Sequence, residues 1–205
     1  MDIQPLLARD GLPAQTRLLV GAAAALWRAD WPALTAWTEA ARSCAAPREE
    51  LEETLLMCVL FCGFPRAITA WGVVDEAWPA TRSPTGGALP AAEQAAAGSA
   101  LFTEIYGDND AQVRAMLRGY HGELHDFVLE AAYGRILTRP ALAAATRELI
   151  AVGVLAAQGQ RRQFLGHARG AQHLGATREQ LREALWTALD ADESSVDEWL
   201  ALVRA

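Results

Sequence analysis

Two residues in the last third of the chain could carry proton chemistry, Glu148 and His167. They lie on either side of Gly159, which is placed to end one helix before the next begins. At about 1.5 Å of rise per residue, the two side chains stand about 16 Å and 12 Å from that turn, on antiparallel helices. The carboxylate and the imidazole can therefore meet.

The neighbouring residues direct both side chains toward the protein interior. Glu148 shares a helical stripe with Val152, and His167 shares one with Phe164. A carboxylate beside an imidazole fixes the ring tautomer and favours the protonated ring, so His167 is a candidate general acid or base oriented by Glu148. The pair could also be a hydrogen bond of the core without chemistry, and spacing alone leaves both interpretations open.

The helices that position this pair belong to an internal repeat. When the chain is aligned with itself so that Thr16-Arg17 falls on Thr146-Arg147, the match continues without a gap and places Leu51 on Leu181. The copies span about residues 12–78 and 138–204. We expect each copy to form a helical hairpin followed by a third helix.

The first copy differs from the second at the two positions of interest. It has Leu18 and Trp37 where the second copy has Glu148 and His167. The hairpin therefore does not need the pair in order to form, and we expect at most one such site in each chain.

Turn residues predict the helices of the first copy. Asp30 can cap a helix that ends near Cys44, and Pro47 precedes a second helix that Gly63 interrupts. In the second copy we expect helices at about residues 143–158 and 161–173 and two further helices. Each of these begins with a capping box, formed by Thr177 with Gln180 and by Ser195 with Glu198.

The predicted fold class is all-α with two repeats, because Ala, Leu, Arg and Glu fill long stretches between a few clusters of Pro and Gly. We divide the chain into a first repeat without the pair (1–78), a linker (79–90), connecting helices (91–137) and a second repeat with the pair (138–205). The linker is assigned from its content of turn residues.

Composition excludes several classes of protein. A net charge of −7 disfavours binding to nucleic acid. The longest apolar runs reach about half of the roughly 20 residues needed to cross a bilayer, so we expect a soluble, cytoplasmic protein without a membrane partner. The chain has no glycine-rich phosphate loop, and we expect no cofactor.

The cysteines and the remaining histidines give weaker signals. Cys44, Cys58 and Cys62 form no Cys-x-x-Cys motif, and the last two lie in an apolar run where thiols usually act as small hydrophobes. His121 and His125 have a spacing that can bind a metal on a helix, but Gly122 weakens that helix and no third ligand is evident. We therefore predict no metal site.

Four runs form a recognisable set. The second copy contains Thr138-Arg-Pro, Gln163-Phe-Leu-Gly-His167-Ala-Arg169-Gly and Gly175-Ala-Thr-Arg-Glu-Gln-Leu-Arg-Glu183, and the first contains Leu60-Phe-Cys-Gly63-Phe-Pro-Arg-Ala67. Together they resemble the carboxymuconolactone decarboxylase and alkylhydroperoxidase D superfamily over about two-thirds of the chain. The resemblance implies interlocking helical hairpins, usually in rings of six repeats, and therefore a homotrimer of this two-repeat chain.

The resemblance also separates two branches of that superfamily. The alkylhydroperoxidase D branch has a Cys-x-x-Cys between its Glu and its His, and this chain has Gln160 and Gln163 there. Amide side chains form neither a thiolate nor a disulfide, so a thiol peroxidase mechanism is disfavoured. The decarboxylase branch, which needs no cysteines, is the better match.

The resemblance therefore implies a lyase similar to 4-carboxymuconolactone decarboxylase, acting without a cofactor on a small lactone or keto acid. His167 would move a proton, Glu148 would orient it, and Arg169 or Arg147 would hold a carboxylate of the substrate. Two alternatives stay open. One is a peroxidase-like antioxidant with peroxiredoxin activity that recruits Cys58 or Cys62, and the other is a non-catalytic oligomeric scaffold.

Overall fold

The structure is a computed structural model that describes residues 3–81, 87–189 and 193–203. Within these ranges every regular element is a helix, which confirms the predicted all-α class. The elements follow in the order α1 (Gln4–Leu7), α2 (Ala14–Arg28), α3 (Trp31–Ser43), α4 (Arg48–Ala77), α5 (Ala91–Tyr106), η1 (Gly107–Asn109), α6 (Asp110–Tyr120), α7 (Gly122–Phe127), η2 (Val128–Leu137), α8 (Ala144–Ala157), α9 (Arg161–His173), α10 (Arg178–Leu189) and α11 (Glu193–Leu200).

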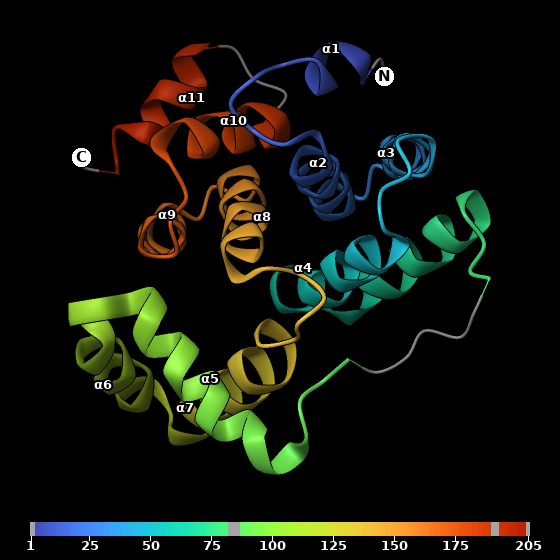
Figure 1. Ribbon diagram of the computed structural model, residues 1–205. Helices are drawn as coiled ribbons and strands as arrows, with labels where there is room; N and C mark the ends of the chain where they lie inside the picture. Colours follow the sequence, from blue (N-terminus) through green and yellow to red (C-terminus); the bar gives the residue numbers. More distant parts are fainter. Residues whose placement is uncertain (1–2, 82–86, 190–192, 204–205) are drawn as a thin grey trace.

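The two repeats meet at the centre of the molecule. Helix α2 of the first repeat and α8 of the second pack side by side, with α3 and α4 next to α2 and with α9 and α10 next to α8 (Figure 1). Both central helices are buried along nearly their whole length, because both are rich in Ala, Leu and Val. This pairing forms one continuous apolar core under both repeats.

The hairpin of the second repeat agrees with its sequence signals. Helix α8 ends just before Gly159, whose φ of 72° is a left-handed conformation that glycine adopts easily. Helix α10 begins at the predicted capping box, in which Thr177 and Gln180 exchange hydrogen bonds between side chain and backbone at 2.8 and 3.1 Å. The prediction for α11 was wrong in position, since this helix already begins at Glu193 and contains Ser195.

In the first repeat, Asp30 caps α3 by accepting a hydrogen bond from the backbone N–H of Ala33. Helix α4 is interrupted at Gly63 as predicted, where φ is 74° and ψ is 166°. By length and composition α4 could cross a membrane. Its first half buries Leu55 and Cys58 in the common core, and the break at Gly63 divides it into two shorter helices. Its length and composition are therefore weak evidence for a membrane span.

The connecting helices form a separate layer at the lower edge of Figure 1. Helix α5 crosses η2, a π-helix, at two glycines. A side-chain carbon at Gly98 would lie 2.5 Å from the backbone nitrogen of Gly134, so the two backbones are in direct contact. Residues 79–81 and 87–90 of the predicted linker are non-helical, and its residues 82–86 lie outside the described part of the chain.

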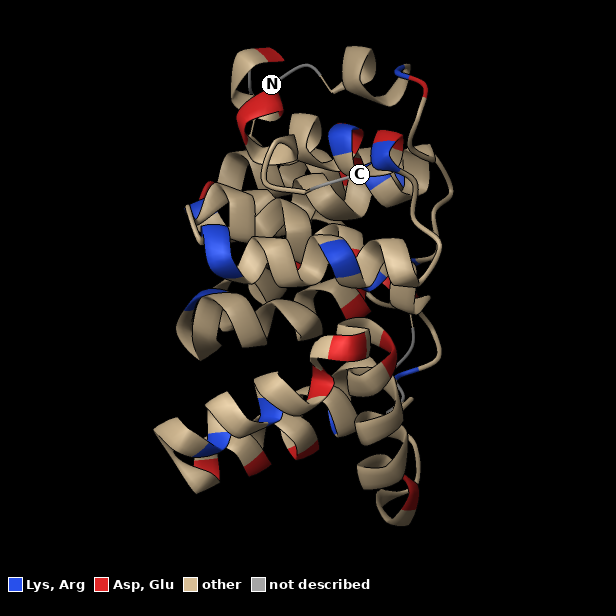
Figure 2. Cartoon of the chain, turned by 90° about the vertical axis from the view of Figure 1, so that its left-hand side faces the viewer, with Lys and Arg blue, Asp and Glu red and all other residues tan. Residues whose placement is uncertain are grey.

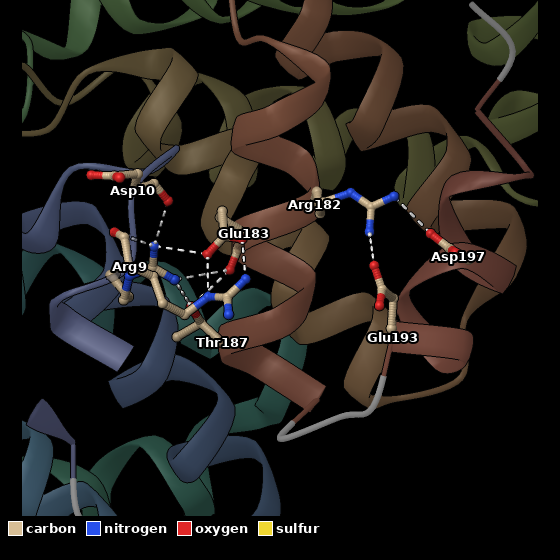
Figure 3. A network of polar contacts seen from close by, with 8 residues as sticks. Arg9, Asp10, Arg182, Glu183, Thr187, Glu193 and Asp197 are labelled. Carbon is tan, nitrogen blue, oxygen red and sulfur yellow. Dashed lines mark hydrogen bonds and ion pairs between the residues drawn. The ribbon is translucent and has the colours of Figure 1, made fainter. Parts of the chain in front are cut away.

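A buried cluster of ion pairs joins the end of the second repeat to the start of the first. Nη2 of Arg9 and Nη2 of Arg17 lie 2.5 and 2.9 Å from the carboxylate of Glu183, and Thr187 binds Arg17 from the next turn of α10 (Figure 3). Burial raises the pKa of Glu183, but the hydrogen bonds and charges of the two arginines outweigh this and lower it.

An equivalent cluster has its arginines in the second copy and its carboxylate in the first. Arg139 and Arg147 bind the carboxylate of Glu53 at 2.7 and 2.8 Å, and Glu53 is the repeat equivalent of Glu183. Each copy thus supplies the carboxylate for arginines of the other copy. The two clusters hold the repeats together in a pseudo-symmetric arrangement.

Charged residues are mixed over the surface. On the face shown in Figure 2, the positions of Arg and of Asp or Glu are interspersed along the same helices. This distribution agrees with the alternation of Arg and Glu in the sequence.

Candidate active site

The structure brings together the two residues on which the sequence analysis centred. Nδ1 of His167 on α9 lies 2.9 Å from Oε2 of Glu148 on α8. Glu148 is buried, with 2% of its side chain exposed, whereas 14% of the His167 side chain is exposed. A carboxylate in the interior thus holds an imidazole at the boundary with solvent.

Neighbouring residues fix this geometry. Gly170 lies one turn after His167, and a side-chain carbon there would lie 2.8 Å from Oε2 of Glu148, so only glycine leaves room for the carboxylate. The ring of Phe61, from α4, meets the His167 ring edge-on at 5.8 Å between centroids. The imidazole is therefore held from two sides.

The pair favours a protonated imidazole. Burial alone would lower the pKa of His167, but the negative charge of Glu148 and its hydrogen bond outweigh burial and raise the pKa above its ordinary value. Nδ1–H is the donor to Glu148, and no hydrogen bond from a described protein group occupies Nε2. Nε2 is therefore the nitrogen that can exchange a proton with a ligand.

A cavity of about 600 Å³ lies beside His167. One wall is α9, and the opposite wall is formed by α5, α6, α7 and the start of η2, which Figure 1 shows facing α9. Its volume is in the range of protein pockets that bind small molecules. The connecting helices thus enclose a cavity beside the Glu148–His167 pair of the second repeat.

One stripe of α9 faces this cavity. It consists of four residues whose spacing puts them on one side of a helix and which line the cavity with His167: Arg162, Gly166, Arg169 and His173. Nδ1 of His173 lies 2.9 Å from the carbonyl oxygen of Ile105, which fixes this second imidazole. The stripe gathers cationic and polar groups around the candidate acid.

The two arginines predicted to bind substrate are placed differently. Arg169 lines the cavity. Arg147 is 1% exposed and binds Glu53 and the carbonyl oxygen of Arg139, and it is absent from the described lining of the cavity. Its guanidinium serves the contact between the repeats, so of the two predicted arginines the one that lines the cavity is Arg169.

Tyr106, from the connecting helices, was not anticipated from the sequence. It lines the cavity, its ring lies 3.6 Å from where a side-chain carbon of Gly166 would be, and its hydroxyl lies 3.3 Å from that of Tyr133. Burial raises the pKa of Tyr106 despite the hydrogen bond from Tyr133, so the phenol stays neutral. Its position follows from how α5 packs on α9, which no local pattern reveals.

The equivalent place in the first repeat is filled. Trp37 occupies the position of His167 and is 3% exposed. Its ring lies over Gly21, where a side-chain carbon would overlap the ring. The first repeat therefore uses this position for packing, and the described chain has one Glu–His pair of this kind.

The residues behind the other sequence hypotheses lie elsewhere. Cys58 is buried in α4 and donates a hydrogen bond to Cys62, which raises the pKa of Cys58 and lowers that of Cys62. Neither thiol is among the described residues lining the cavity. Nδ1 of His121 accepts a hydrogen bond from the N–H of Glu123 at the start of α7, and His125 is buried against Asp126.

Fold and site together define a class of protein, namely a two-repeat helical protein whose described residues include one buried Glu–His pair beside a ligand-sized cavity. The chain belongs to the carboxymuconolactone decarboxylase family, whose sequence model matches residues 4–76 and 123–202. The second matched region begins within the connecting helices and includes all of α8 and α9.

A curated relative gives a weaker and more specific similarity. The chain is 28% identical over 90 residues to a 4-carboxymuconolactone decarboxylase of Acinetobacter baylyi. The aligned part is 43% of this chain and 66% of the relative, so the match covers just under two thirds of the relative's length. This similarity supports a family-level relationship.

Proposed function

We propose that the protein is a decarboxylase-like lyase that acts on a small organic acid, with His167 as the general acid and base. One observation carries the proposal: a buried carboxylate binds one ring nitrogen of His167, and the ring lines a cavity of small-molecule size. Membership of the carboxymuconolactone decarboxylase family supports the same chemistry.

The proposed step is loss of CO2 from a lactone or keto acid. The bond between the carboxylate and its carbon breaks, CO2 leaves, and the electron pair stays on that carbon, where a conjugated carbonyl can delocalise it. Protonated His167 delivers its Nε2 proton to the carbon and later regains a proton from solvent. Glu148 keeps the ring oriented and stabilises the imidazolium throughout.

Arg169 holds a carboxylate of such a substrate. Its guanidinium lines the cavity on the same helix as His167, and a planar guanidinium binds a carboxylate through two parallel hydrogen bonds. The residues that act in this proposal are all supplied by the chain, and no cofactor has a role in it.

His167→Gln tests the proposal. We expect CO2 release from 4-carboxymuconolactone or a related lactone or keto acid to fall about 100-fold or more, which is the usual contribution of a general acid. His121→Gln is the matched control, because this exposed histidine lies outside the cavity lining. A His167→Gln variant with the same melting temperature and the same rate as the wild type would contradict the proposal, as would a wild type that releases no CO2 from any acid of this class.

We also propose that the chain forms a homo-oligomer, with a homotrimer expected. Phe64 and Ile68 support this, because both are about two-thirds exposed on the second half of α4, at 68% and 67%. Analytical ultracentrifugation should give the mass of three chains, and the mass of one chain would contradict it.

A further inference from the structure

The wall of the cavity that faces His167 comes from the connecting helices and is largely apolar. Helix α6 contributes Val113, Met116 and Leu117, and α7 and η2 add Leu124 and Val128. Val113, Met116, Leu117 and Val128 are only partly buried, so their surfaces are available to a ligand. Burial of a ligand's apolar atoms against this wall lowers the free energy of the complex, because apolar surface leaves water.

The charges of the cavity lie on the other wall. Among the described lining residues, the formally charged side chains are Arg162 and Arg169, both on α9. No Asp or Glu is in that described lining, although the chain has 25 acidic and 18 basic residues. The cavity is therefore cationic on the α9 side, and the opposite wall is uncharged and largely apolar, with Asn109, Gln112 and Tyr120 as its polar members along η1 and α6.

Arg162 links the two walls. Its Nη2 lies 2.7 Å from the sulfur of Met116, so the guanidinium of one wall reaches the apolar side chains of the other. A ligand with its charge at the arginines could thus lay an alkyl or aryl body against α6 directly. A compact acid with carboxylates at both ends would instead place charge against Val113, Met116 and Leu117, whose side chains have no hydrogen-bond donor to compensate for its desolvation.

We infer that the cavity selects acids whose charge lies at one end of an extended apolar body, alkyl or aryl, over compact acids with carboxylates at both ends. The inference rests on the proposed function, since it names the substrate class of the same site. The charged end binds Arg162 or Arg169, and the apolar body lies along Val113, Met116 and Leu117. The connecting helices, which lie outside the repeated hairpins, are then the elements that determine specificity.

Binding of a graded series of acids tests the inference without any need for turnover. Isothermal titration calorimetry is done with butanoate, hexanoate, octanoate, 3-phenylpropanoate and succinate. Each buried methylene should tighten binding about threefold to fourfold, so octanoate should bind about tenfold or more tighter than hexanoate. Succinate should bind more weakly than both. Equal affinity for succinate and octanoate would overturn the inference.

Two variants on neighbouring positions sharpen the test. Met116→Asp puts a carboxylate into the apolar wall and should weaken octanoate about tenfold or more. Ala115→Asp adds the same charge to an exposed position of α6 that does not line the cavity, and it should leave binding within about twofold. If the two variants bind octanoate equally, the inferred orientation is wrong.

A third variant covers the case in which Met116→Asp fails to fold. Val113→Trp fills the cavity without adding charge and should weaken binding of octanoate more than binding of butanoate. The same loss for both acids would contradict the inference.

Failure of this inference is distinguishable from failure of the proposed function. Chain-length dependence can be absent while His167→Gln still loses activity, and it can be present while that variant keeps full activity.

Discussion

Glu148 and His167 divide two tasks between two environments. Glu148 is buried, so its charge acts on His167 with little screening by water. His167 lies at the edge of the cavity, so its second nitrogen is within reach of a ligand. The raised pKa of His167 results from this division, since burial of the ring alone would lower it.

The pair should make stability depend on pH. The folded pKa of His167 is raised above the value of about 6.5 expected in the unfolded chain. Its stabilising contribution is therefore complete below about pH 6.5 and is lost as the pH rises through the folded pKa. Glu148→Gln should cost about 1.5–3 kcal/mol in the free energy of unfolding at pH 5.5 and less at pH 9.

Urea denaturation at the two pH values measures this difference. Glu76→Gln is the control, because it removes the same charge from an exposed position of α4 and should change stability little at either pH. A loss in Glu148→Gln that is equal at both pH values, or larger at pH 9, would show that the carboxylate does not stabilise the protonated ring.

Among individual residues, the sequence predicted the Glu148–His167 pair but not the partners of the arginines around it. Glu148 and His167 could be found because a helical hairpin has a known rise per residue and Gly159 marks its turn. Arg147 was predicted to bind the substrate because its actual partner could not be seen in the sequence. That partner, Glu53, lies far away in the chain and in the other copy. The pairing of Arg17 with Glu183 has the same origin, so only the three-dimensional packing of the repeats reveals it.

The helices themselves followed closely from local signals. Helix α9 has the predicted bounds, Arg161–His173, because Gly159 ends α8 just before it and Gly175 ends α9 itself, both in left-handed conformations. A helix over the residues of η2 was predicted as part of the connecting helices, but its π-helical geometry was not. The Gly98–Gly134 crossing that joins it to α5 is a tertiary contact between two separate elements, and hydrophobic periodicity carries no information on it.

That crossing provides a prediction for the connecting helices. Gly98→Ala should destabilise the protein by about 2 kcal/mol or more, because its new carbon would lie 2.5 Å from the backbone of Gly134. It should also weaken binding of acids, since α5 forms part of the cavity wall. Gly119→Ala is the matched control, because nothing lies within 4 Å of a side-chain carbon there and alanine favours a helix by up to about 1 kcal/mol.

Thermal denaturation and calorimetry with octanoate check both effects. Gly98→Ala should melt at a lower temperature than the wild type, and Gly119→Ala at the same or a higher one. Equal melting temperatures for the two variants would mean that α5 and η2 can separate without cost.

The whole molecule shows how one repeat can keep a site that the other lacks. The repeats share the cross-paired clusters around Glu53 and Glu183, so both remain necessary for the fold. In the first repeat Trp37 packs where the second has His167, and the cavity lies between the connecting helices and the second repeat. The two repeats thus form the scaffold, and the connecting helices between them supply the cavity wall opposite α9.

The central claim is tested most directly by titration of the His167 ring by NMR in protein labelled with ¹⁵N at histidine, with its resonances assigned by their loss in His167→Gln. We predict a pKa above about 6.5 in the wild type and a lower pKa in Glu148→Gln. A wild-type pKa at or below about 6.5, or one that Glu148→Gln leaves unchanged, would contradict the claim that buried Glu148 stabilises the protonated ring of His167.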